Sequence, residues 1–149
     1  MILPDFKAFP RAGRILGIDW GLRRIGVAVS SPDREFVFVR DTICMSRGDV
    51  NHAERIAKLA EDEKVVGIIV GLPLYADGRE SDTTKMVRAF VADLAMQTDL
   101  PICMIEENLT SVVAQENMGR VRVRDLKEKL DSESARVILE NAIAIINRA

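Results

Sequence analysis

The sequence is poor in the residues on which several kinds of protein site depend. In 149 residues it has one histidine, two cysteines, one tryptophan and one tyrosine. The single histidine, His52, cannot build a zinc site, and Cys44 and Cys103 lack the spacing of metal ligands. Both cysteines stand among apolar residues, so we expect two buried, reduced thiols.

A surplus of positive charge is also missing. The chain has 21 lysines and arginines against 23 acidic residues, a formal net charge of −2, and its pI is about 5.5. A protein that binds nucleic acid through bulk charge alone is strongly basic. Any nucleic-acid binding must therefore come from a local patch or through metal ions.

Long apolar runs are absent as well. No stretch approaches the ~18 residues of a membrane-spanning helix, and residues 1–13 lack the charged start and apolar run of a signal peptide. We therefore expect a cytoplasmic protein with no membrane contact. The length, with 48% hydrophobic and 30% charged residues, fits one globular domain over 1–149, without internal repeats.

What the sequence does contain is a clear order of strands and helices. Pro4 and Pro10 mark residues 1–13 as an irregular arm. Three short apolar runs joined by tight turns then predict an antiparallel meander. Further on, helical spacing alternates with fully apolar runs, which are typical of strands buried on both faces of a sheet. The expected strands are 14–19, 25–31, 35–43, 65–73 and 100–107, and the expected helices are 52–63, 81–97, 110–117 and 131–148.

This order defines a fold class. A meander followed by crossovers gives an α/β protein, with a five-stranded mixed sheet of antiparallel and then parallel strands, flanked by helices. That is the RNase H-like layout. The last helix is expected to turn an apolar face inward and to follow a charged, mobile segment, 119–130.

Acidic residues fall where buried structure meets a loop. Asp19 ends the first strand, Glu106 and Glu107 end the last one, and Asp131 opens the final helix. Open α/β sheets place their active sites at such edges. If the first and last of these strands are neighbours in the sheet, Asp19 and one of the two glutamates lie side by side. A helix packed across them could bring Asp131 to the same point.

Such a cluster favours a metal. Carboxylates held within a few Å repel one another, and one takes up a proton unless a cation neutralises them. Hard oxygen ligands suit Mg²⁺ or Mn²⁺. Two such ions about 3.5–4 Å apart can activate a water and stabilise the leaving oxygen of a phosphodiester. The acids therefore predict a metal-dependent phosphodiesterase.

Each acid also has a structural alternative. Asp131 precedes Ser132 and could be the N-cap of the last helix. Glu106 and Glu107 could be surface acids at a strand end. Asp19 stands in apolar sequence and needs a partner, which is either a cation or hydrogen-bond donors in the turn that follows it.

Four segments together carry a family resemblance. They are GIDWGLRRIGVAVS (17–30), GIIVGLPLYADGRES (67–81), EENLTSVVA (106–114) and DSESARVILENAI (131–143). They resemble the YqgF family, also called RuvX, in the family's order and across residues 15–146. The resemblance implies an RNase H fold related to Holliday-junction resolvases, and a nuclease that processes pre-16S rRNA.

The resemblance also implies roles for particular residues. The family's catalytic, metal-binding acids fall on Asp19, Glu107 and Asp131. The chain departs from the family's Asp-Glu-Arg motif, since Glu106 replaces the aspartate and Asn108 the arginine. Asparagine copies neither the charge nor the fork geometry of a guanidinium, so substrate handling is expected to differ from the family's pattern.

Two groups of arginines flank the acids. Arg23 and Arg24 lie in the turn after Asp19 and could contact phosphates, or they are solvated turn residues. The second group precedes Asp131. If its segment is extended, the alternating arginines lie on one side and could guide a nucleic-acid backbone toward the metals; the alternative is a solvated, flexible loop. This group consists of Arg120, Arg122 and Arg124.

The loop GLPLYADGRES follows a buried strand and opens toward the same edge. Gly71 and Pro73 are expected to fix a tight turn, with Ser81 or Thr83 capping the next helix. It is no P-loop, because the Gly-Lys-Ser/Thr ending is absent. For Tyr75, stacking on a base is one role open to it.

The predicted function is processing of the 5′ end of pre-16S rRNA by a Mg²⁺- or Mn²⁺-dependent endonuclease. The alternatives are a nuclease of branched DNA, a non-catalytic nucleic-acid-binding module and, more remotely, an ATPase of the actin-like kind, which needs two such domains. Both a monomer and a homodimer are open, and a two-fold dimer would favour the branched-DNA substrate.

Overall fold

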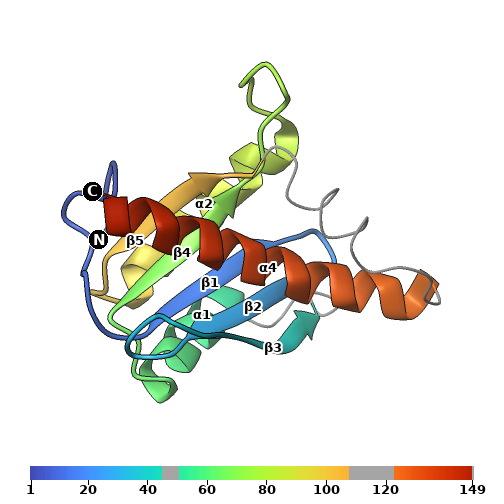
Figure 1. Ribbon diagram of the computed structural model, residues 1–149. Helices are drawn as coiled ribbons and strands as arrows, with labels where there is room; N and C mark the ends of the chain where they lie inside the picture. The colour runs from blue at the N-terminus through green and yellow to red at the C-terminus, as the bar shows by residue number, and fades with distance from the viewer. Residues whose placement is uncertain (45–50, 108–122, 149) are drawn as a thin grey trace.

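The structure, a computed structural model, describes residues 1–44, 51–107 and 123–148. Within these ranges it describes all side chains except those of residues 123–132. Helix α4 crosses one face of a five-stranded sheet, while α1 and α2 cover the other (Figure 1). The elements are β1 (Ile15–Trp20), β2 (Arg24–Ser30), β3 (Val37–Cys44), α1 (His52–Asp62), β4 (Gly67–Leu72), α2 (Asp82–Gln97), β5 (Ile102–Glu106) and α4 (Val123–Arg148).

The sheet has the mixed topology that the sequence predicts. Its strand order is β3-β2-β1-β4-β5. The first three strands pair antiparallel, and β4 and β5 join parallel to β1 and to each other. Parallel pairing requires crossover connections, which α1 and α2 provide. The prediction of an RNase H-like α/β fold is confirmed.

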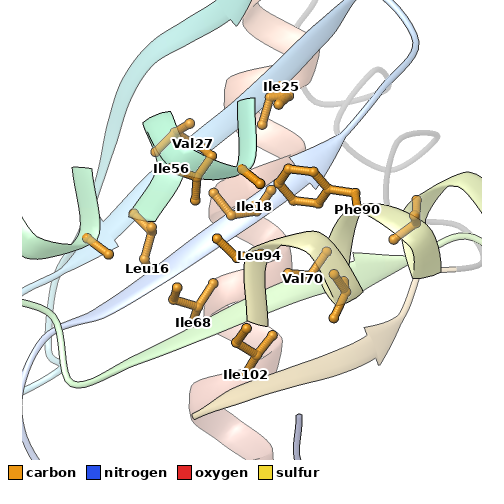
Figure 2. Close-up of a cluster of buried hydrophobic side chains, with 14 of the residues drawn as sticks. Leu16, Ile18, Ile25, Val27, Ile56, Ile68, Val70, Phe90, Leu94 and Ile102 are labelled. Atoms are coloured by element: carbon orange, nitrogen blue, oxygen red, sulfur yellow. The ribbon is translucent and has the colours of Figure 1, made fainter. Parts of the chain in front are cut away.

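Strand β1 separates two hydrophobic cores. Its side chains alternate, so Leu16 and Ile18 face α1 and α2, where they pack with Val70 and Phe90 (Figure 2). Ile15 belongs to the second core, under α4. The same alternation puts Gly17 and then Asp19 on the α4 face.

Helix α4 lies very close to β1. A Cβ atom on Gly17 would come within 2.9 Å of the Leu139 Cβ and 3.1 Å of the Ala135 carbonyl oxygen, so glycine is what permits this approach. The helix runs in the direction opposite to β1 (Figure 1). Its earlier turns therefore lie toward the end of β1 that carries Asp19.

The start of the last helix differs from the prediction. Residues 123–130 are helical rather than mobile, so α4 begins eight residues before Asp131. This segment, VRDLKEKL, is rich in good helix formers, and acids and lysines stand at i,i+4 spacing in it. The N-cap alternative for Asp131 is therefore wrong, and Arg124 lies in a helix rather than in the extended segment or loop considered for it. The predicted helix 110–117 lies outside the described residues.

Two smaller features complete the fold. Cys103 is buried as predicted, but Cys44 ends the edge strand β3 and is exposed, which corrects the prediction of two buried thiols. The first residues reach the opposite edge, where Ile2 forms a bridge with Ile102. Among the described residues, no helix is long and apolar enough to span a bilayer.

Candidate functional site

Asp19 lies at the carboxyl end of β1, half-buried under α4. Its cross-strand neighbour on β2 is Gly26, which has no side chain to cover it. On the other side, the parallel register with β4 places Ile18 beside Val70, so the next residue along β4, Gly71, lies beside Asp19. Two glycines thus flank this carboxylate within the sheet.

Glu107 is the first residue after β5. Its N–H donates a 3.2 Å hydrogen bond to the Leu72 carbonyl, which extends the β4–β5 pairing by one step. A Cβ on Gly71 would lie 2.9 Å from the Glu107 carboxyl carbon and 2.5 Å from the Ile138 Cδ1. The missing side chain at position 71 therefore makes the space into which the Glu107 carboxyl fits.

The strands β1 and β5 are not neighbours, unlike the arrangement supposed from the sequence, because β4 lies between them. The two carboxyl groups meet across the space at Gly71. The pKa of Glu107 is raised to about 9, first by burial, then by the charge of Asp19 and a hydrogen bond between the two side chains. Glu107 therefore keeps its proton at neutral pH and donates it in the hydrogen bond to the Asp19 carboxylate. This proton removes the repulsion that two ionised carboxylates would have at this distance.

This donor set fits a divalent cation. It offers hard oxygen ligands and excess negative charge once Glu107 ionises. Among the residues with described side chains, no group of three or more histidine, cysteine or acidic residues could hold a metal. The pair thus provides two of the three predicted ligands.

The third predicted ligand, Asp131, is placed by its backbone alone. It lies in α4, one turn before Ala135, whose carbonyl faces Gly17. Because α4 runs opposite to β1, residue 131 belongs to the part of the helix nearer the Asp19 end of that strand (Figure 1). Its side chain is outside the description, so its role as a ligand stays a prediction.

Glu106 has a different environment from its neighbour Glu107. It is exposed and borders a surface cavity with Leu72, Arg88 and Met104, on the other face of the sheet. Side chains alternate along β5, so only one of the two adjacent glutamates can face Asp19. That one is Glu107.

Of the arginines predicted to contact phosphate, the structure describes two fully. Arg23 is exposed in the β1–β2 turn and Arg24 begins β2, both a few residues after Asp19 and at the same edge. Their contact with phosphate stays a prediction. Arg120 and Arg122 lie outside the described residues, as does Asn108, and nothing is described of the Arg124 side chain.

Gly71 is the site residue that the sequence interpretation missed. It was expected to shape a turn, but it lies inside β4 and makes room for Glu107. A glycine within a buried, otherwise aliphatic strand often marks the close approach of another group, and that signal was present in GIIVGLP.

The fold and this site define an RNase H-like protein with a carboxylate pair at the carboxyl ends of its central strands. A family model described as RuvX, Holliday junction resolvase, matches residues 13–144, and the chain belongs to this family.

Relatives and solved structures agree with that assignment. A protein of Maridesulfovibrio salexigens named "Putative pre-16S rRNA nuclease" is 38% identical over 133 residues, covering 88% of this chain and 98% of its own. One of the same name from Bradyrhizobium sp. is 37% identical, covering 95% and 91%. Thermus thermophilus RuvC in complex with a Holliday junction substrate has a TM-score of 0.57 at 11% identity, over 91% of this chain and 96% of its own. At that identity the likeness shows the fold alone.

Proposed function

We propose that this RuvX-family chain is a divalent-metal-dependent endonuclease that hydrolyses phosphodiester bonds in structured nucleic acid. The observation that carries the proposal is the Asp19–Glu107 pair, two carboxyl groups held together in a partly buried site, where burial and the charge of Asp19 raise the pKa of Glu107 to about 9. Membership of a family described as resolvases supports the same chemistry.

Asp19, Glu107 and Asp131 are the residues that would hold Mg²⁺ or Mn²⁺. When bound, the cation supplies Lewis-acid stabilisation of the charge that develops on the phosphoryl group. Glu107 would have to lose its proton to act as a ligand, and Asp19 lies beside it. Gly71 and Ile138 fix the direction of the Glu107 carboxyl and shield it from bulk water.

Arg23 and Arg24 would contact the substrate backbone. They follow Asp19 directly in the chain, and Arg23 is exposed to solvent. With a net charge of −2, the protein depends on such local positive charge and on the bound cation to attract a polyanion.

The substrate that we propose is pre-16S rRNA, cleaved toward its 5′ end in the cytoplasm. The relatives that carry this name are 37–38% identical to the chain, which covers nearly their whole length. Branched DNA is the second candidate, favoured by the description of the family model. A resolvase needs two sites related by a two-fold axis, so a monomer in solution would favour the RNA substrate.

The test is cleavage of a labelled pre-16S rRNA 5′ segment and of a four-way DNA junction in magnesium. Asp19→Asn and Glu107→Gln should each lower the cleavage rate at least about 100-fold. Glu106→Gln, one residue away on the other face, is the matched control and should cut at the wild-type rate. If Asp19→Asn, still folded, cleaved at the wild-type rate, the proposed site would be wrong.

A further inference from the structure

The loop between β4 and α2, residues 73–81, rises from the same edge as the carboxylate pair (Figure 1). It leaves the sheet at Leu72, whose carbonyl accepts the hydrogen bond from the Glu107 N–H. Three residues span at most about 11 Å, so Tyr75 lies within that distance of Leu72 along the backbone. The tip of this β4–α2 loop is thus a near neighbour of the proposed catalytic site.

The tip of the loop is held by backbone hydrogen bonds. Leu74 and Glu80 form an isolated β-bridge. Within it, the Tyr75 N–H donates to the Arg79 carbonyl at 2.9 Å, and the Gly78 N–H donates to the Tyr75 carbonyl at 2.8 Å. Gly78 adopts a φ of 89°, a value that favours glycine. The tip is therefore a small hairpin of defined shape.

The base of the loop is anchored to helix α2. Ser81 is the N-cap, and its side chain and that of Thr84 form a reciprocal capping box. The Thr84 hydroxyl also donates to the Pro73 carbonyl, where the loop begins. Both ends of the loop are thus fixed to the sheet and the helix, and the position of Tyr75 is fixed with them.

An aromatic ring and a guanidinium are presented to solvent at this tip. Tyr75 is 55% exposed, and the Arg79 guanidinium lies 5.6 Å from the centre of its ring. The Arg79 Nε donates to an Asp77 carboxylate oxygen at 2.5 Å, and the Arg79 side chain is 77% exposed. Asp77 therefore holds Arg79 in place over the ring.

The charge of the loop argues against a role in gripping phosphates. Its acids, Asp77 and Glu80, outnumber its single base, Arg79, and Glu80 is in turn paired with Arg88. The tip instead presents the aromatic ring of Tyr75 with the planar Arg79 guanidinium against it. Aromatic rings and guanidinium groups of this kind stack on nucleobases. A base inside a continuous duplex has no free face, so the ligand is an unpaired base.

We propose that Tyr75, supported by Arg79, stacks on an unpaired nucleobase within about three nucleotides of the cleaved phosphodiester and so directs cleavage to the border between duplex and single strand. This inference rests on the proposed nuclease function and adds a substrate feature to it. The backbone span from Leu72 to Tyr75, at most about 11 Å, corresponds to the length of about three stacked nucleotides.

The experiment measures binding in the cleavage-silent Asp19→Asn protein. The probes are an RNA duplex with a short single-stranded extension, carrying 2-aminopurine at the unpaired positions, and a blunt duplex of the same sequence, each also made as DNA. Tyr75→Ala should raise the Kd for the extended probe about tenfold and abolish the change in 2-aminopurine fluorescence, and leave the blunt duplex unaffected. Tyr75→Phe keeps the ring and should stay within about twofold of the parent.

Phe36→Ala is the control, because Phe36 is another exposed aromatic side chain, 60% exposed, before β3 and outside the β4–α2 loop. It should leave binding to both probes unchanged. Equal Kd values for Tyr75→Ala and its parent, or equal weakening of both probes, would overturn the inference. If the Asp19→Asn protein bound none of the probes and the wild-type protein cleaved none of them, the proposed nuclease function would be wrong, and the inference would fall with it. The RNA and DNA arms show which nucleic acid supplies the base.

Discussion

Two glutamates at opposite ends of the sheet are neutralised in different ways. Glu63, just after α1, is paired with Arg14 at 3.4 Å and Arg40 at 3.0 Å. Glu107, at the Asp19 end of β1, faces another carboxyl group and has a pKa raised to about 9. Both side chains are largely shielded from solvent, so burial does not separate them. Two arginines neutralise Glu63, whereas Glu107 lies against another acid, and a proton or a cation relieves the repulsion between them.

The largest effect expected from this difference is a dependence of stability on pH. The pKa of Glu107 is higher in the folded protein than in the unfolded chain, so its stabilising contribution is complete below about 4.5 and is lost as the pH rises through about 9. Without metal, the free energy of unfolding should fall by up to about 1.4 kcal/mol per pH unit in that window.

Urea denaturation of the wild type and Glu107→Gln in chelator, between pH 5 and 9, measures this slope. The difference between the two proteins isolates Glu107 from the other titrating groups. Glu107→Gln should be the more stable of the two at pH 9, and Glu63→Gln should show the wild-type slope. Parallel pH profiles for the wild type and Glu107→Gln would mean that Glu107 is not held protonated by Asp19.

A smaller effect is expected from filling the space beside Glu107. Gly71→Ala places a Cβ 2.5 Å from the Ile138 Cδ1 and 2.9 Å from the Glu107 carboxyl, so one of them must move. Overpacking of this kind costs about 1–3 kcal/mol in the free energy of unfolding, and cleavage should fall with it. Denaturant titration and the cleavage assay measure both effects. An alanine variant with wild-type stability and rate would show that Gly71 does not shape the site.

The smallest effect is expected from the acid that the protein neutralises itself. Glu63→Gln leaves Arg14 and Arg40 without their carboxylate, at a site only partly screened from water. The loss should be about 1 kcal/mol in the free energy of unfolding, with cleavage and magnesium dependence unchanged. A loss of cleavage in this variant would remove the distinction between the two glutamates.

The fold could be predicted from the sequence because hydrophobic periodicity and short turns leave few topologies. Asp19 could be placed for the same reason, since it ends a buried strand in the middle of the sheet. The last helix was also expected to turn an apolar face inward. The structure confirms this, since the following residues of the helix are buried: Ala135, Ile138, Leu139, Ala142 and Ile146.

Other features depend on contacts that a linear pattern does not contain. Periodicity alone did not decide which of Glu106 and Glu107 faces Asp19, and the family resemblance did. The early start of α4 was missed because a charged segment has no apolar stripe to indicate a helix, although its helix propensity is high. The space at Gly71 requires Ile138, from a distant helix, to lie beside Glu107.

The most direct test of the central claim is magnesium binding measured by isothermal titration calorimetry in two buffers of different ionisation enthalpy. Wild-type protein at pH 7 should bind magnesium and release close to one proton, since Glu107 must ionise to become a ligand. Glu106→Gln should behave in the same way, and Glu107→Gln should lose most of the binding. If Asp19→Asn and Glu107→Gln both bound magnesium with wild-type affinity and proton release, the carboxylate pair would not be the metal site.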